Sequence, residues 1–250
     1  MTGGGALVIL ALAPLALAGC ESSKARSARE RAAASHRVHE QGLRIARTNP
    51  DVRVAATTLV NDAHAGRSAA VVELRNTSRR TLAALPLLFT VTGAGGKKLF
   101  SNDLPGASAD LTTVPSLAPG DTLTWVNDAI VGISGGRAVD ARVGEPSAPV
   151  AAAGAAPPRV RVSGVRLDRD PIDGVTAVGR VVNASSIPQQ RLVIFATARR
   201  GGRIVAAGRA VVPVVQPGAK GARFTVFFVG DPTGAKLSLQ APAVNLGRQP

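Results

Sequence analysis

Hydrophobic and polar positions divide the chain into three parts of different character. Residues 6–18 are uninterruptedly apolar, residues 21–48 mix alanine with charged side chains, and from Asp51 onward short apolar stretches are separated by Gly, Pro, Asn and Asp. Successive side chains of a β-strand point to opposite faces of its sheet, and turn residues separate neighbouring strands. The pattern therefore predicts a mainly β fold after residue 50.

The expected strands form two groups. The first group covers residues 52–60, 68–76, 84–92, 97–101, 122–131 and 137–143, and the second covers 159–167, 174–183, 190–199, 202–212, 222–229 and 235–240. Pro86 falls inside one expected strand, which indicates an edge position or a bulge. In strand 190–199, one face is expected to carry Leu192, Ile194 and Ala196, and the other Val193, Phe195 and Thr197.

Short segments of the first group recur in the second in the same order. The corresponding pairs are Val52-Arg-Val54 and Val160-Arg-Val162, Asn76 and Asn183, Gly95-Gly96 and Gly201-Gly202, and Pro119-Gly120 and Pro217-Gly218. An internal repeat of this kind predicts two tandem domains, here residues 51–145 and residues 159–250. Several short strands with turns between them predict that each domain is an antiparallel β-sandwich.

Residues 146–158 separate the two repeats and consist mostly of Pro and Ala. A segment of this composition forms a semi-extended linker that has little to bury. We therefore expect the two repeats to be able to reorient relative to each other.

The apolar run at residues 6–18 is too short to cross a bilayer comfortably. At about 1.5 Å per residue a helix of this length reaches roughly 20 Å, against a hydrocarbon core of about 30 Å. A short apolar segment that ends in small residues is typical of a secretory signal peptide, so residues 1–19 are predicted to be removed.

The tetrapeptide Leu17-Ala18-Gly19-Cys20 contains the only cysteine of the chain and resembles the lipobox of bacterial lipoproteins. The resemblance implies cleavage between Gly19 and Cys20 and a diacylglyceryl group on the Cys20 thiol. It also implies a protein held on the cell membrane by this lipid anchor, facing the extracellular side, or the periplasm where a second membrane is present. The first five residues lack the Lys or Arg with which signal peptides usually begin. The alternative is that Cys20 is a small apolar residue of a signal or membrane helix.

Residues 20–50 would then be a lipid-anchored stalk. Their Ala, Arg and Glu content favours a partly helical, basic segment. Its cations either contact anionic headgroups and wall polymers or belong to a merely soluble tether. His36 and His39 could share a helix face, but two ligands are too few for a closed metal site.

The order of segments within each repeat resembles the small immunoglobulin-like repeats of bacterial surface proteins, including the FxLYD type. In both copies a strand ends in an Asn-x-Ser segment that is expected to form a turn, a longer apolar strand follows, and a Gly hairpin precedes a Pro-Gly turn. The Asn-x-Ser segments are Asn76-Thr-Ser78 and Asn183-Ala-Ser185. Thr90-Val-Thr92 and Ala196-Thr-Ala198 stand where the FxLYD type has its Tyr-Asp pair. The resemblance implies immunoglobulin-like sandwiches that serve as a binding or scaffold module in the cell envelope.

Composition removes several classes of function. Lipidation of the single cysteine would leave no disulfide, no cysteine metal site and no cysteine nucleophile. Six Phe, one Trp and no Tyr are few for stacking on single-stranded nucleic acid, and together with export they argue against a nucleic-acid partner. Trp125 is expected to fill the first core, with an exposed binding anchor as the alternative.

The net charge of +14 is concentrated in the second repeat. Residues 159–250 contain fourteen basic and four acidic side chains, whereas the basic and acidic side chains of residues 54–145 balance. Such asymmetry favours anionic partners. The candidate anion-binding residues of the second repeat are Arg199, Arg200, Arg203, Arg209 and Arg223.

No segment carries a recognisable catalytic or cofactor motif. Gly93–Lys98 departs from both phosphate-binding glycine patterns and is expected to be a hairpin. The cluster Asp168, Asp170 and Asp173 suits either a calcium site or an Asp-Gly turn, and we favour the turn. His64 is expected to be a solvated loop residue, because the sequence offers it no catalytic partners. We therefore predict no enzyme activity, no cofactor and no metal.

Two functions remain open at this point. The first is a non-enzymatic, lipid-anchored surface protein whose tandem immunoglobulin-like domains bind a partner, such as another envelope protein, or act as a scaffold. The alternative is a polyanion-binding module that grips cell-wall polymer, lipid headgroups or an acidic partner through the basic second repeat. An exported enzyme is a third class, and it would depend on His64 or the Asp168 cluster.

Overall fold

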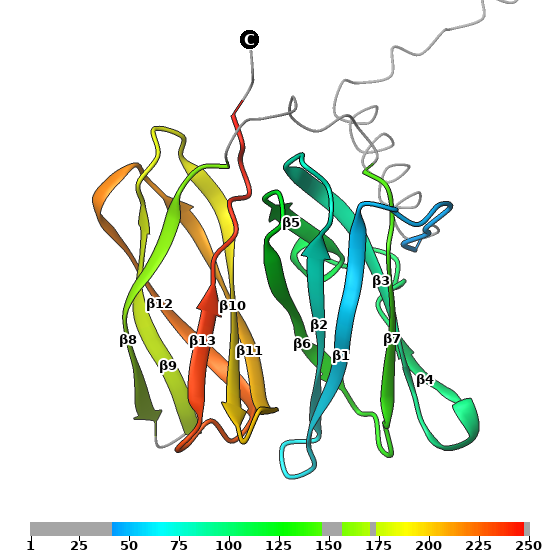
Figure 1. Ribbon diagram of the computed structural model, residues 1–250. Helices are drawn as coiled ribbons and strands as arrows, with labels where there is room; N and C mark the ends of the chain where they lie inside the picture. Colours follow the sequence, from blue (N-terminus) through cyan, green and yellow to red (C-terminus); the bar gives the residue numbers. More distant parts are fainter. Residues whose placement is uncertain (1–41, 147–156, 171–173, 248–250) are drawn as a thin grey trace, which may run out of the picture. The chain divides into compact units, whose positions relative to one another are not determined.

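The computed structural model describes residues 42–146, 157–170 and 174–247, and the chain from Gln41 onward forms one compact unit. The predicted signal peptide, Cys20, His36, His39 and most of the predicted linker lie outside these residues. The described part is mainly β and contains several antiparallel sheets (Figure 1). None of the helices in it has the length and hydropathy that a membrane span requires.

The first repeat is built from two sheets that face each other. One sheet has the order β1 (Val52–Asp62), β2 (Arg67–Asn76) and β6 (Thr122–Val131). In the other sheet β3 (Leu82–Thr92) pairs with β4 (Lys98–Ser101), β5 (Thr113–Leu117) and β7 (Ala138–Val143). Two 3₁₀ turns, η1 (Ala94–Gly96) and η2 (Ala109–Leu111), lie in the connections that flank β4.

Large apolar side chains from both sheets fill the space between them. Leu74 and Trp125 come from the first sheet, Leu87 and Phe89 from the second, and all four are almost completely buried. The Phe89 ring lies edge-on to Trp125 at a centroid distance of 5.9 Å and stacks on Phe100 at 5.7 Å. The indole Nε1 of Trp125 donates a hydrogen bond to the Thr113 carbonyl. Trp125 is therefore part of the core, as the sequence predicts.

The second repeat is a single antiparallel sheet of six strands. Its order is β13 (Lys236–Gln240), β10 (Gln189–Arg200), β11 (Arg203–Val215), β12 (Gly218–Gly230), β9 (Gly174–Asn183) and β8 (Val160–Asp170). The two edge strands, β13 and β8, contact each other, so the sheet curls around its own apolar interior. Leu192, Ile194 and Ala196 are buried in this interior, on the face that the alternation of β10 predicts.

All twelve expected strands are present, with ends that differ by a few residues. The one that sequence analysis misses is β5, whose central Pro115 argues against a strand. Pro86 lies where β3 changes its partner from β5 to β7, which agrees with the irregularity expected there. The Gly201-Gly202 pair forms a two-residue hairpin between Arg200 and Arg203 with positive φ angles of 57° and 79°, a conformation that glycine adopts without strain.

A buried asparagine stands at the same place in both repeats. The amide nitrogen of Asn76 donates to the carbonyls of Arg80 and Leu117 at 2.7 and 3.0 Å, and that of Asn183 donates to Ile187 and Val215 at 2.8 and 3.1 Å. In each copy the amide oxygen accepts hydrogen bonds from the backbone and the hydroxyl of the serine two residues later, Ser78 or Ser185. The internal repeat is therefore a structural repeat, and the predicted turn role of these segments is confirmed.

The likeness extends to the strand that follows. Eight residues after each asparagine, Ala84 and Arg191 adopt left-handed φ angles of 51° and 48°. Neither residue is paired with the neighbouring strand, although the register on its two sides is unchanged. Such a conformation is unusual for residues other than glycine, so its recurrence supports a common origin of the two repeats.

Replacing Asn183 by alanine is expected to lower the free energy of unfolding by about 2 kcal/mol, because it leaves buried carbonyl groups without a donor. Urea denaturation measures this change. Gln190→Ala is the matched control, since Gln190 is an exposed amide residue, and it should change stability by less than about 0.5 kcal/mol. Equal effects of the two substitutions would contradict a structural role for the buried amide.

Candidate functional site at the junction of the repeats

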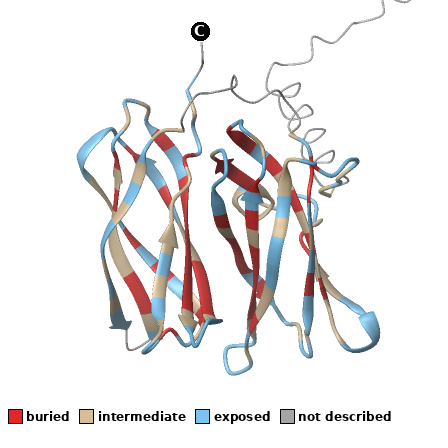
Figure 2. Ribbon diagram, in the orientation of Figure 1, coloured by how far each residue is buried: buried red, intermediate tan, exposed pale blue. Residues whose placement is uncertain are grey.

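Three strands are buried on both faces over part of their length. Ser68–Val72 of β2, Trp125–Asp128 of β6 and Leu192–Ala198 of β10 contain only buried residues (Figure 2). One face of each strand lines the core of its own repeat, and the other face meets the neighbouring repeat. Four residues of the second repeat accordingly join the apolar cluster of the first, namely Val193, Phe195, Ala207 and Val229.

This shared core corrects the expectation that the repeats reorient. The Phe195 ring lies 6.3 Å from that of Trp125, centroid to centroid, so an aromatic contact joins the two repeats. Separating them would expose fully buried apolar side chains to water, at roughly 25 cal/mol for each Å² exposed. A Pro- and Ala-rich linker permits reorientation only where the domains that it joins have no apolar surface in common.

Charged side chains complete the junction around Arg209 of β11. The Arg209 Nε atom lies 2.8 Å from Oδ1 of Asp128, and the Arg209 backbone N–H donates to Oδ2 of the same carboxylate at 3.1 Å. Its Nη1 atom also forms an ion pair with Asp110. The same carboxylate forms an ion pair with Arg191, whose Nη2 atom lies 2.9 Å from Oδ1 of Asp110. The side chains of Arg209, Asp128 and Asp110 are only 14%, 12% and 8% exposed.

A further ion pair crosses the junction at one end of β10. Arg199 pairs with Glu73 of β2, and both side chains are about one-third exposed. On the same side of the junction, the Gln240 side chain accepts a hydrogen bond from the Thr124 N–H at 2.7 Å and donates one to the Thr122 carbonyl at 3.0 Å. Polar groups therefore fix the alignment of the two apolar surfaces.

The environment of Asp110 favours its ionised form. Burial alone would raise the pKa of its carboxyl group, but the hydrogen bond from Ser108 and the charge and hydrogen bond of Arg209, with that of Arg191, lower this pKa below the usual 3.8. Because the charged form is the stabilised one in the folded protein, the group contributes stability at neutral pH that is lost on protonation.

We expect the stability that Asp110 contributes to disappear in acid. Its pKa is lower in the folded than in the unfolded chain, so the contribution is complete above the unfolded value near 3.8 and declines as the pH falls through the folded value. Urea denaturation of the protein and of Asp110→Asn at several pH values tests this. The difference in unfolding free energy should narrow below pH 3.8, and a constant difference would contradict the role of its charge.

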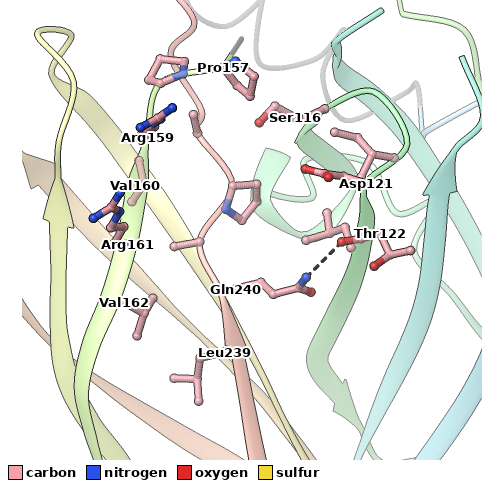
Figure 3. Close-up of a pocket in the computed structure, with 17 residues that line it drawn as sticks. Ser116, Asp121, Thr122, Pro157, Arg159, Val160, Arg161, Val162, Leu239 and Gln240 are labelled. Carbon is pink, nitrogen blue, oxygen red and sulfur yellow. Dashed lines mark hydrogen bonds between the residues drawn. The ribbon is translucent and has the colours of Figure 1, made fainter. Parts of the chain in front are cut away.

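A hollow of about 380 Å³ lies beside this junction at the end nearest the linker (Figure 3). Its walls come from the turn between β5 and β6, the start of β8 and the end of β13. Figure 3 shows Gln240 reaching across to Thr122 while Arg159 and Arg161 line the opposite wall. The hollow offers hydrogen-bonding groups of both repeats together with two arginines, but it contains no histidine or cysteine.

A second hollow of about 540 Å³ lies beside the two residues with left-handed φ angles. Ala84 and Arg191 both line it, with Pro115, Val193 and Val244 among the apolar residues and Asp110 at its edge. The junction therefore combines two hollows with several ion pairs. They provide surfaces for binding, and neither brings together a nucleophile, a base and an acid.

The five arginines proposed for anion binding do not form one surface. Arg199 and Arg209 are paired with carboxylates of the first repeat, and the Arg209 side chain is only 14% exposed, so these two stabilise the junction and are not free for an external polymer. Arg200 and Arg203 flank the exposed Gly201-Gly202 hairpin. Arg223 lies on β12, where it lines a different hollow with Arg166 and Arg180.

The other candidate residues lie in a turn or near the end of a strand. His64 is exposed in the turn between β1 and β2. Asp168 is exposed near the end of β8, whereas Asp173 and the Asp170 side chain lie outside what the structure describes. Within the described chain, no three His, Cys, Asp or Glu side chains are close enough to hold a metal ion.

Sequence analysis missed the carboxylates of the junction, Glu73, Asp110 and Asp128. Each is a single acidic residue without a motif. A usable signal lies in the run Leu192–Ala198, which places apolar residues and one threonine on both faces of a strand. An antiparallel strand with a solvent-facing side should alternate with polar residues, so this run already indicates that a second surface covers β10.

No family model matches the chain, and no curated protein matches it either.

Proposed function

We propose that the chain is a non-enzymatic, lipid-anchored protein of the bacterial cell envelope, in which two immunoglobulin-like repeats act together as a binding or scaffold module. The lipobox-like segment that ends in Cys20 supports the anchor. The equivalent Asn-x-Ser corners and sandwich-like sheets support the immunoglobulin-like assignment of both repeats.

The observation that carries the proposal is the junction. A buried apolar contact and the ion pairs of Arg209 hold the two repeats in one arrangement. A fixed arrangement of two β domains presents a defined surface to a partner at low cost in conformational entropy. It suits a scaffold or binding role better than that of a flexible spacer.

The anchor is tested by labelling bacteria that express the full chain with radioactive palmitate. The protein should incorporate label and enter the detergent-rich phase when Triton X-114 separates, and Cys20→Ala should do neither. The matched control is Ser22→Ala, which alters a small residue just beyond the proposed cleavage position and should keep the label. Undiminished labelling of Cys20→Ala would reject the lipid anchor.

Anion binding by the second repeat is the second candidate function. It is favoured by a specific observation, the group of arginines on β8, β9 and β12 that line one hollow.

A further inference from the structure

The arginines of the second repeat fall into two groups. Arg191, Arg199 and Arg209 pair with carboxylates of the first repeat. Arg166, Arg180 and Arg223 lie on β8, β9 and β12, which Figure 1 draws in green, yellow-green and orange. Among the described residues none of these three is within ion-pair distance of a carboxylate, so their charges remain available.

The pairing of the strands brings these side chains together. Arg180 of β9 lies directly opposite Arg223 of β12, and Arg166 of β8 lies opposite Val178, two residues before Arg180. Residues two apart on a strand point to the same face of the sheet. The three arginines line one hollow of about 400 Å³, whose other lining residues include Gly179 and Thr225.

A bulge in β8 places Arg166 on this face. The register between β8 and β9 shifts between Ser163 and Arg166, at a point where Gly164 has a φ of +60°. Before the shift Val160 and Val162 contact the core, and after it Val165 and Leu167 do. Without the extra residue, Val165 would face outward and Arg166 would face the core. Bulges often redirect a side chain in this way beside functional sites.

The positive charges of these arginines repel one another when no anion is bound. Like charges directly opposite each other on neighbouring strands destabilise their pairing. The Arg180 guanidinium also donates a hydrogen bond to the Lys220 carbonyl, which limits its freedom to move away from Arg223. An anion in the hollow would turn this repulsion into attraction to a shared ligand.

The geometry points to a binding site for the phosphate groups of an anionic polymer on the face formed by Arg166, Arg180 and Arg223. Each guanidinium presents a planar fork of donors that matches phosphate oxygens, and the exposed Thr225 hydroxyl lies in the same hollow. A phosphodiester chain offers such groups repeatedly, so neighbouring cations such as Lys220 can add to the attraction. The acidic residue nearest along β8 on this face, Asp168, limits the surface at one end.

This inference extends the proposed binding role by naming a ligand. It rests on the proposed function only in that the protein must face the outside of the cell, where such a polymer lies. The experiment uses the full-length chain carrying Cys20→Ala, purified in neutral detergent, and measures binding of poly(glycerol phosphate) by isothermal titration calorimetry. We expect binding that weakens as salt increases. The triple substitution Arg166→Gln, Arg180→Gln and Arg223→Gln should weaken it at least about tenfold.

The matched control removes the same charge from the first repeat by Arg75→Gln, Arg137→Gln and Arg142→Gln, all at exposed positions. It should change affinity less than about twofold, because salt screens distant surface charges. Equal weakening by both triple variants would reject a defined site, and so would the absence of binding by the parent protein. Binding to phosphatidylglycerol vesicles but not to the polymer would reject the polymer as ligand.

Two further measurements keep the outcomes separate. Thermal unfolding should show that the Arg166, Arg180 and Arg223 variant stays folded and is at least as stable as the parent, because repulsion between Arg180 and Arg223 is removed. The same substitutions in the chain with intact Cys20 should leave palmitate labelling unchanged. Loss of polymer binding with retained labelling therefore tests the site, and loss of labelling tests the anchor.

Discussion

Replacing Trp125 by alanine is expected to lower the free energy of unfolding by about 4 kcal/mol, the largest effect of any single substitution considered. The indole is completely buried, contacts the rings of Phe89 and Phe195, and donates a hydrogen bond to the Thr113 carbonyl. A cavity at this position would loosen the core of the first repeat and its contact with the second. Urea denaturation followed by circular dichroism measures the loss.

The matched control for this substitution is Val131→Ala. Val131 ends the same strand, β6, but is 65% exposed, so the change should be below about 0.5 kcal/mol. Trp125→Phe should be milder than Trp125→Ala because it retains most of the ring volume. A loss below about 1 kcal/mol for Trp125→Ala would contradict the central position of the indole.

Replacing Arg209 by alanine is expected to cost about 3 kcal/mol. The substitution leaves the carboxylates of Asp110 and Asp128 largely buried without their main cation, and a buried charge that loses its partner is strongly destabilising. Arg203→Ala is the matched control, because Arg203 lies on the same strand and is exposed. It should change stability by less than about 0.5 kcal/mol.

A compensating variant separates loss of charge balance from loss of packing. Substituting Arg209→Met, Asp110→Leu and Asp128→Leu together removes the whole buried charge group, so the triple variant should be more stable than Arg209→Ala alone. If the triple variant is less stable than Arg209→Ala, the ion pairs contribute more than they cost in desolvation. Both variants are compared by urea denaturation at neutral pH.

The strands could be predicted from sequence because alternation of side chains is a local property. Leu192, Ile194 and Ala196 face the core as their spacing indicates, and the Asn-x-Ser segments form the expected turns. The turn role of Asn76 and Asn183 follows from residue type, whereas their complete burial depends on carbonyl groups up to 42 residues away. Such long-range partners leave no mark in a short motif.

The junction could not be predicted from charge counts. Arg209 and Arg203 are alike in sequence, both arginines on one basic strand, yet only Arg209 meets Asp110 and Asp128 of the other repeat. The net charge of the second repeat describes its attraction to anions as a whole and cannot separate paired from unpaired cations. The group of Arg166, Arg180 and Arg223 likewise depends on the bulge at Gly164. Strict alternation along β8 would place the Arg166 side chain on the opposite face of the sheet.

The continuous burial of Leu192–Ala198 has a practical consequence for work on fragments. A fragment that contains only the second repeat would expose Val193 and Phe195 to water. A fragment that contains only the first repeat would expose the apolar side chains of β2 and β6 that these residues cover. Exposed patches of this kind promote aggregation. Expression of either half by itself should yield insoluble material, whereas a recombinant product that spans residues 42–247 retains the complete interface.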